Sequence, residues 1–228
     1  MSEGKRIGVA LSGCGVNDGA EIHEAVLTLL ALDRAGAQII PMAPNVSQMH
    51  VIDHQAGAPV PGEERNVLVE SARITRGEIQ DMARVEADDL DALIFPGGFG
   101  AAKNLCTLAV DGPQMSINGE VDRLIKAMHT ANKPLGFICI APALAAKSLG
   151  ELAPRLTIGD DPGTAEALEA LGAVHISCPV DDIVVDEEQR IVTTPAYMLG
   201  PSIAPVSRGI DKLVKAKVGR AGGAEEGQ

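Results

Sequence analysis

Aromatic residues are scarce in this chain of 228 residues, which has no tryptophan, one tyrosine and three phenylalanines. Because apolar residues still make up 46% of the sequence, the core must be built from Ala, Val, Leu and Ile. The sequence also lacks an apolar run of the ~20 residues that a membrane-spanning helix needs. Residues 1–6 lead into an expected strand rather than a signal-peptide core, so we expect a cytoplasmic protein with no membrane partner.

Basic residues are outnumbered, with 19 Lys and Arg against 31 Asp and Glu and a formal net charge of −12. Nucleic-acid binding rests largely on Lys and Arg side chains that neutralise phosphates. This balance therefore argues against nucleic acid as the main partner. Beyond solubility, it indicates little else about function.

The sequence lacks paired cysteines and complete cofactor motifs. Its four cysteines, at positions 14, 106, 139 and 178, form no C-x-x-C pair, so we expect free thiols rather than disulfides or a zinc site. Gly13, Gly15 and Gly19 follow the first expected strand but are spaced one residue away from the dinucleotide fingerprint. No acidic residue ends the second strand and no P-loop is present. We therefore predict no nucleotide or other cofactor.

Alternating apolar strands and amphipathic helices predict an α/β fold with a mostly parallel sheet and helices on both faces, plus a small β-hairpin. The chain opens with a strand at 6–11, a helix at 20–35 that Asp18 would cap and Gly36 would end, and a strand at 37–42. We expect one domain over 1–218 and a disordered tail over 219–228. The later expected elements are strands at 92–95 and 134–138, hairpins at 49–60 and 183–194, and a last helix at 197–217, irregular near Pro201 and Pro205.

Cys139 stands where a short buried strand, Pro134–Ile138, turns into an Ala-rich helix. The N-terminus of a helix presents backbone N–H groups and a positive dipole, which can lower the pKa of a thiol and favour a nucleophilic thiolate. The alternative is a small apolar residue in a core strand, because a free cysteine is often buried and inert. This stretch alone leaves both readings open.

Two other features belong at the same end of the predicted sheet, where open α/β sheets place their sites. Glu21 and Glu24 are three residues apart and share a helical face, although each can also be a solvated carboxylate that favours the helix dipole. The turn Pro96-Gly97-Gly98-Phe99-Gly100 allows close approach of backbone to a ligand, and its N–H groups can bind an oxyanion. It can equally be only a tight turn. Lys103 and Asn104 after it are weaker candidates for holding a polar substrate.

Together these stretches resemble the class I glutamine amidotransferase-like superfamily in its PfpI branch and, within it, the ElbB-like glyoxalases, a group linked to isoprenoid biosynthesis. Each motif is moderately specific alone, and the combination is strongly specific. The matching segments span nearly the whole chain: 11–24, 73–78, 95–105, 134–143, 179–186 and 192–198.

The resemblance implies a flavodoxin-like sandwich in which Cys139 is the nucleophile at an elbow after a strand. In the family a glutamate on the first helix hydrogen-bonds that cysteine, and Glu24 is the best match, with Glu21 one turn earlier. The family's oxyanion donors would map to the backbone N–H groups of Gly98 and Ile140. Cys14 could face the same cleft as a second thiol, or be merely a small loop residue.

The chain departs from the family in its histidines. Glutamine amidotransferases carry a His after the late strands, but no His follows His175, and Thr193–Tyr197 fill that region. Relatives with a His directly after the cysteine, or after the short strand that follows, have Ile140 or Gly159-Asp160 here. A conventional triad is therefore not expected. His23 lies between the two glutamates but points off their face, and His129 and His175 are expected to be structural or at the surface.

The resemblance implies a cofactor-free, glutathione-independent glyoxalase of the glyoxalase III type, a lyase that converts glyoxal-like 2-oxoaldehydes to 2-hydroxy acids. Cys139 would add to the aldehyde, and Glu24 would shuttle the proton. A deglycase would use the same residues. A non-enzymatic thiol redox sensor or chaperone-like protein is the alternative from another class, and a glutaminase would need a His that is missing. The family also suggests a homodimer.

Overall fold

A seven-stranded sheet forms the centre of the computed structural model, which describes residues 4–220. Its strand order is β10-β11-β7-β6-β1-β2-β5, and every neighbouring pair is parallel except β10 with β11. This confirms the predicted α/β fold with a mostly parallel sheet. The strands are β1 (Arg6–Ala10), β2 (Gln38–Ala43), β5 (Gln80–Asp81), β6 (Ala92–Phe95), β7 (Leu135–Ile138), β10 (Val184–Asp186) and β11 (Ile191–Thr194).

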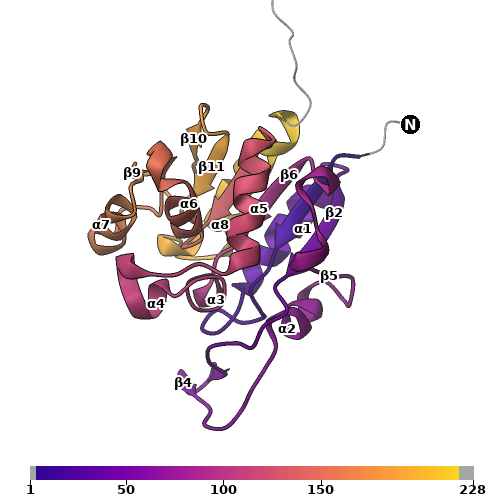
Figure 1. The fold of residues 1–228 in the computed structure, drawn as a ribbon, viewed down its shortest axis with the longest axis vertical. Helices are drawn as coiled ribbons and strands as arrows, with labels where there is room; N and C mark the ends of the chain where they lie inside the picture. Colours follow the sequence, from indigo (N-terminus) through magenta and orange to yellow (C-terminus); the bar gives the residue numbers. More distant parts are fainter. Residues whose placement is uncertain (1–3, 221–228) are drawn as a thin grey trace, which may run out of the picture.

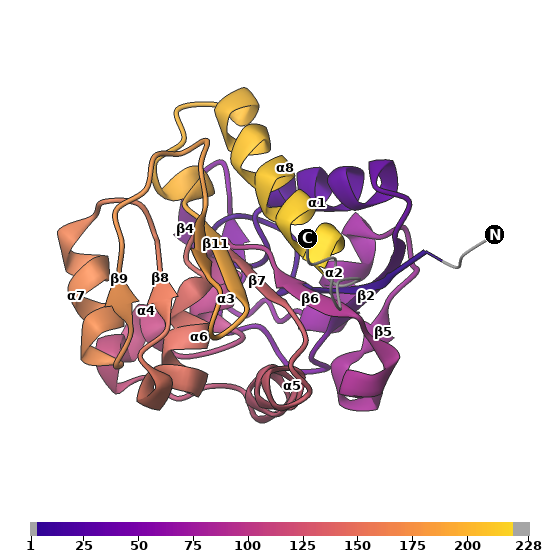
Figure 2. The same ribbon diagram turned by 90° about the horizontal axis from the view of Figure 1, so that it is seen from above.

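Helices cover both faces of this sheet. Figure 2 shows α1 and α8 side by side on one face and α5 on the other. In Figure 1, α5 crosses in front of the sheet, and α6 and α7 lie toward the β10–β11 end. The α-helices are α1 (Ile22–Arg34), α2 (Val67–Ile74), α3 (Phe99–Lys103), α4 (Leu108–Asp111), α5 (Gly119–Thr130), α6 (Pro142–Leu149), α7 (Pro162–Ala170) and α8 (Ile203–Arg220).

Alternation along the central strands divides the core into two layers. Leu93 and Phe95 of β6 pack with Phe137 of β7 beneath α5, and the two phenylalanine rings stack with centroids 5.1 Å apart. Ile94 and Ile138 point to the opposite face, into the layer formed with α1 and α8. Successive side chains of a strand face opposite sides of a sheet, so strands buried on both faces are apolar throughout. Aliphatic side chains on both faces of the strands therefore fill most of the core, which needs few aromatic residues.

Smaller elements lie outside the central sheet. Strands β3 (Ile52–Asp53) and β4 (Ala58–Pro59) form the first predicted hairpin, and β10 with β11 forms the second, which joins the main sheet. Strands β8 (Arg155–Leu156) and β9 (Val174–His175) pair in parallel. The 3₁₀-helices are η1 (Met82–Arg84), η2 (Ala87–Asp89), η3 (Gly112–Gln114), η4 (Gly150–Leu152) and η5 (Ala196–Met198). Within residues 4–220, no helix has both the length and the apolar character required to cross a membrane.

Two local predictions are wrong, and a third is only partly covered by the structure. Asp18 does not cap α1, because its Oδ2 accepts the backbone N–H of Ile52 (2.7 Å) and the side chain of Glu21 caps the helix instead. The expected last helix is divided into η5 and α8, with Gly200-Pro201 between them. Because α8 extends to Arg220, the helix runs into the predicted tail, whose remaining residues lie outside the described part of the chain.

Candidate active site

Cys139 occupies a sharp turn between β7 and α6. Its φ of +63° is in the left-handed region that a residue with a side chain rarely adopts. Its N–H donates to Thr194 O (3.0 Å), which extends the β7–β11 pairing to this residue, and Pro142 then begins α6. A strained residue persists only where its surroundings hold it, and such residues cluster at functional sites. The structure thus confirms the predicted position of Cys139 between strand and helix.

The sulfur of Cys139 faces the glycine turn that follows β6. The backbone N–H groups of Gly98 and Ile140 both hydrogen-bond this sulfur, as the family resemblance implies for the oxyanion donors. Gly98 has a φ of +97°, and a Cβ on Gly97 would lie 2.7 Å from Glu24 Oε2 and closer still to the Cβ of Cys139. Glycine is therefore required at both positions for the turn to approach the thiol.

Glu24 is fully buried beside this thiol, and its carboxyl group is held from three sides. Oε2 accepts the N–H of Gly97 (2.9 Å), Oε1 accepts the N–H of Tyr197 (3.1 Å), and the thiol of Cys139 donates to the carboxylate. Burial raises the pKa of Glu24 to about 8; the charge of Glu21 adds to this effect and the hydrogen bonds oppose it. At neutral pH Glu24 is therefore mostly protonated yet close to its titration point, which suits proton exchange.

Cys139 and Glu24 form a coupled pair. Burial raises the pKa of the Cys139 thiol well above its ordinary value, and the charge of Glu24 raises it further. The N–H groups of Gly98 and Ile140 act in the opposite direction, because they stabilise the thiolate. A thiolate forms here when the thiol proton moves to the Glu24 carboxylate. The two groups then never carry a negative charge at the same time.

Glu21 connects the first helix to the glycine turn. Its carboxylate caps α1 by accepting the N–H of Glu24 (2.7 Å), and its own N–H donates to Gly97 O (2.9 Å). These bonds fix Glu24 relative to the turn after β6. Glu21 is 8% exposed, and its carboxylate contributes negative charge to the wall of the site.

A cavity of about 250 Å³ opens above the Cys139 sulfur. Cys139, Glu21, Gly98 and Ile140 all line it, so four of the six predicted site residues surround one space. This volume lies just below the ~300–1,000 Å³ range of drug-sized pockets, which suits a small ligand. The lining residues are Val16, Glu21, Gly98, Phe99, Cys139, Ile140, Thr164, Tyr197 and Met198.

Cys14 lies on the other side of the first loop, toward α2. Cys14 is not among the described residues that line the cavity. Its thiol interacts electrostatically with the charges of Glu70, Arg73 and Asp18. Burial, and next the charge of Glu70, raises the pKa of this thiol. The placement favours the interpretation of Cys14 as a loop residue, and its contact with a substrate stays a prediction.

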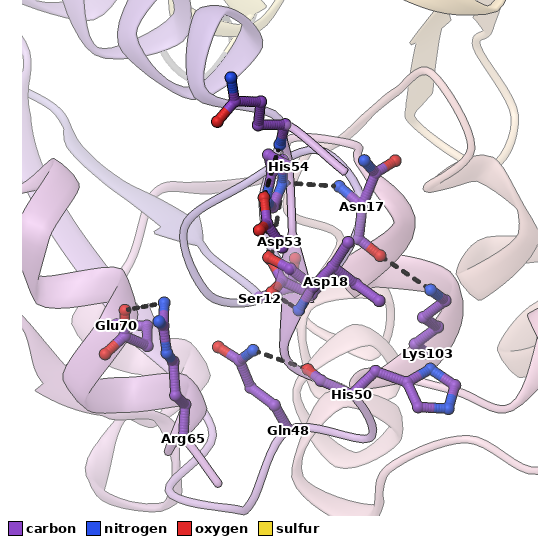
Figure 3. A network of polar contacts seen from close by, with 12 residues as sticks. Ser12, Asn17, Asp18, Gln48, His50, Asp53, His54, Arg65, Glu70 and Lys103 are labelled. Atoms are coloured by element: carbon purple, nitrogen blue, oxygen red, sulfur yellow. Dashed lines mark hydrogen bonds and ion pairs between the residues drawn. The ribbon is translucent and has the colours of Figure 1, made fainter. Parts of the chain in front are cut away.

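A polar network holds this first loop in place (Figure 3). Lys103 Nζ donates to Asn17 O (2.8 Å), and the Asn104 amide donates to Ser12 O (2.9 Å) and Asp18 O (2.8 Å). His54 contributes from the excursion before α2, where its Nε2 accepts the N–H of Asn17 (3.2 Å). Lys103 and Asn104 therefore fix the loop that carries Val16 to the cavity, rather than holding a substrate as the sequence suggested.

Tyr197 is the main site residue that sequence reasoning missed. The sequence pattern predicts it as the first residue of the last helix, but it lies in η5, lines the cavity and donates its N–H to Glu24. The available signal was its position, because Thr193–Tyr197 stand where amidotransferases carry a histidine. Thr164 of α7 and Met198 were missed too, since their sequence surroundings resemble those of any helix end.

The histidines make contacts that differ from one to another. His129 Nε2 pairs with Gln189 Oε1 (2.9 Å) and His175 contacts the N–H of Ile158 (3.5 Å), consistent with structural roles. His23 is half-exposed, and its Nδ1 lies 2.8 Å from the hydroxyl of Tyr197. It therefore reaches the site indirectly, through a residue that lines the cavity. In the described residues, no group of three or more His, Cys, Asp or Glu side chains is arranged to hold a metal ion.

Several known proteins are similar to this chain over most of its length. It is 50% identical over 219 residues to the human "Glutamine amidotransferase-like class 1 domain-containing protein 3, mitochondrial", a match that covers 92% of this chain and 81% of that protein. A crystal structure of an isoprenoid biosynthesis protein with amidotransferase-like domain from Ehrlichia chaffeensis is 39% identical, with a TM-score of 0.86 over 94% of this chain and 99% of that one. Drosophila melanogaster DJ-1beta has a TM-score of 0.56 at 16% identity, covering 96% and 95% of the two chains.

The chain belongs to the class I glutamine amidotransferase-like family. The predicted flavodoxin-like fold is thereby confirmed. At its low identity, DJ-1beta supports the fold alone. No protein-family model matches the chain.

Proposed function

We propose that this protein is a cofactor-independent, glutathione-independent glyoxalase of the ElbB-like group that converts glyoxal and related 2-oxoaldehydes to 2-hydroxy acids. One observation carries the proposal: the Cys139 sulfur, at the wall of a cavity of about 250 Å³, meets two backbone N–H donors and the carboxyl group of Glu24, which is buried behind that wall. These groups are a nucleophile, an acid–base residue and an oxyanion site, which addition of a thiol to a small aldehyde requires.

The reaction begins in the molecules whose Glu24 is ionised, when the Cys139 thiol passes its proton to the Glu24 carboxylate. The thiolate attacks the aldehyde carbon C1, so that an S–C1 bond forms and the carbonyl electron pair moves to O1. The N–H groups of Gly98 and Ile140 stabilise that charge, and a proton from Glu24 completes a hemithioacetal.

Isomerisation and hydrolysis follow. The Glu24 carboxylate removes the C1 proton to give an enediolate and returns that proton to C2, while the proton on O1 is replaced by one on O2. The product is a thioester of a 2-hydroxy acid. Water attacks this thioester, the S–C1 bond breaks, and Cys139 and Glu24 regain their starting protons. The sum is one oxoaldehyde plus one water giving one 2-hydroxy acid, with no external oxidant or reductant.

Three other activities have less support. A redox-sensing thiol needs exposure and thiolate character, whereas Cys139 is 7% exposed and its pKa is raised by burial. A deglycase would use the same residues on adducts bulkier than free glyoxal, which suit the small cavity less well. A glutaminase would need a histidine at the cavity wall, where Thr164, Tyr197 and Met198 stand.

The proposal extends to assembly and location. We place the protein in the cytoplasm as a homodimer, without nucleic-acid or membrane partners. Ile22, Val26 and Leu30, spaced by four residues along α1, form a partly exposed apolar stripe that suits contact with a second copy. Size-exclusion chromatography with light scattering would give the mass of one chain if the homodimer is wrong, and cell fractionation tests the location.

The test is consumption of glyoxal and methylglyoxal without glutathione by wild type, Cys139→Ser and Glu24→Gln, with the product identified by NMR. Wild type should form glycolate and lactate. Both variants should lose a hundredfold or more in kcat/KM, roughly 3 kcal/mol of transition-state stabilisation. Equal rates in all three proteins would contradict the roles of Cys139 and Glu24.

A further inference from the structure

The proposed isomerisation moves protons at oxygen as well as at carbon. Glu24 can carry the proton between C1 and C2, but O2 must also gain a proton as the enediolate forms, and O1 must lose one. Gly98 and Ile140 offer only backbone N–H groups, which stabilise charge but do not transfer protons. The step therefore needs a further group with an exchangeable proton beside the substrate.

Tyr197 is placed to supply that proton. It follows β11 in the short helix η5, and its N–H donates to Glu24 Oε1 at 3.1 Å, which fixes its backbone beside the acid–base residue. Tyr197 lines the cavity together with Cys139 and Ile140. Burial raises the pKa of Tyr197, and the charges of Glu21 and Glu24 add to this effect, so the phenol stays protonated at neutral pH.

His23 links this hydroxyl to the solvent. Its Nδ1 lies 2.8 Å from the Tyr197 hydroxyl, with ring centroids 5.7 Å apart, and 4.0 Å from Glu21 Oε1. The His23 side chain is 50% exposed, whereas Cys139 and Glu24 are buried. An imidazole can accept a proton on one nitrogen and release one from the other. The contacts thus form a continuous path from the cavity through Tyr197 and His23 to water.

We propose that Tyr197 is the acid that protonates the second oxygen of the substrate, and that His23 relays protons between Tyr197 and solvent. As Glu24 removes the C1 proton, the electron pair of the C1–H bond forms the C1=C2 double bond, the π pair of C2=O2 moves to O2, and the phenol proton passes to O2. His23 Nδ1–H then returns a proton to the phenolate, and water reprotonates His23. The proton that O1 loses leaves to solvent, so the count of protons is unchanged over the cycle. This inference rests on the proposed glyoxalase activity and supplies the oxygen-side acid that the missing late histidine leaves open.

The test compares Tyr197→Phe, His23→Ala and His23→Asn with wild type in methylglyoxal turnover. Asn keeps a hydrogen-bonding group near the position of Nδ1 but cannot carry a proton at neutral pH. We expect kcat to fall about 100-fold in Tyr197→Phe and in both His23 variants, the lower range for acid–base groups, with KM little changed. Added imidazole should restore part of the rate to His23→Ala, whose exposed site it can reach, and none to Tyr197→Phe.

Two outcomes overturn the relay while leaving the glyoxalase intact: an unaffected Tyr197→Phe variant, or a His23→Asn variant as fast as wild type. An inactive wild type would remove the glyoxalase and the relay together. The pair has a second readout, because Tyr197 is the only tyrosine and the chain has no tryptophan. Near-ultraviolet titration of the phenol should therefore shift in His23→Ala, and an unchanged titration would show that the two side chains are not coupled.

Discussion

Cys139 and Cys106 are both buried thiols, with 7% and 5% exposure, yet their surroundings differ in chemistry. The Cys106 thiol donates to Ala101 O (3.3 Å) and packs in the layer beneath α5. Burial raises the pKa of Cys106 to about 11. Cys139 faces two N–H donors, a carboxyl group and a cavity instead.

The difference shows that burial alone does not distinguish a nucleophile from a packing residue. Burial raises the pKa of both thiols, and backbone N–H groups oppose this effect at both, that of Leu108 at Cys106 and those of Gly98 and Ile140 at Cys139. Of the two thiols, only Cys139 has a neighbouring carboxylate that can take its proton. A carbonyl acceptor, as at Cys106, stabilises the thiol and offers nothing to a thiolate. Reactivity is therefore assigned by the groups that face the sulfur.

The largest expected contrast is in turnover. Cys139→Ala should lower kcat/KM for glyoxal by a hundredfold or more, roughly 3 kcal/mol, because it removes the nucleophile. Cys106→Ala, the matched substitution at the other buried thiol, should leave kcat/KM within a factor of about two of wild type. Steady-state kinetics on both variants measures the contrast, and similar losses in the two would remove the distinction between the thiols.

The glycine turn gives the next contrast. Gly97→Ala should destabilise the fold by about 2 kcal/mol and abolish activity, because the added Cβ overlaps Cys139 and lies 2.7 Å from Glu24 Oε2. Gly119→Ala, at the start of α5, meets open space and should be neutral or slightly stabilising. Urea denaturation compares the two. A Gly97→Ala variant as stable as wild type would show that the turn can yield.

The raised pKa of Glu24 predicts a pH-dependent stability. Between its ordinary value of 4.5 and about 8, the folded protein keeps a proton on Glu24 that the unfolded chain has lost. The free energy of unfolding of wild type, relative to Glu24→Gln, should therefore fall as pH rises through this window. The slope is at most about 1.4 kcal/mol per pH unit. Chemical denaturation at several pH values measures it, and a constant difference would mean that Glu24 titrates normally.

The smallest contrast concerns backbone strain. At position 139, with φ at +63°, Gly should be more stable than Ala by about 1 kcal/mol, because glycine adopts this conformation without penalty. At position 106, Ala should be the more stable of the two. Thermal unfolding of Cys139→Gly, Cys139→Ala, Cys106→Gly and Cys106→Ala measures both differences. If Ala were more stable than Gly at position 139 as well as at position 106, residue 139 would not be strained.

The sequence predicted the framework of the site well, because that framework depends on local patterns. The apolar run before Cys139, the Ala-rich segment after it and the glycines at 97 and 98 each identify a strand end or a turn. Placing Glu24 beside Cys139 required the family resemblance. The charge patterns of Glu21 and Glu24 are alike, and only the structure shows that Glu21 caps the helix while Glu24 meets the thiol.

What the sequence did not predict depends on contacts between distant segments. Asp18 is a residue type that often caps helices, but its carboxylate accepts the backbone N–H of Ile52 in the hairpin instead. The pairing of His23 with Tyr197 joins residues 174 positions apart and has no local signature. The break between η5 and α8 carries Tyr197 to the cavity, and although Pro201 indicates an irregular helix there, nothing local shows where the preceding residues lie.

Trapping of the covalent intermediate tests the central claim most directly. Wild type would be mixed with methylglyoxal, quenched in acid during turnover, digested and mapped by mass spectrometry, with Cys139→Ser as the control. The account predicts one substrate-derived thioester, on the peptide that contains Cys139, and no modification of Cys106. Turnover without an adduct on Cys139, or an adduct that persists in Cys139→Ser, would contradict it.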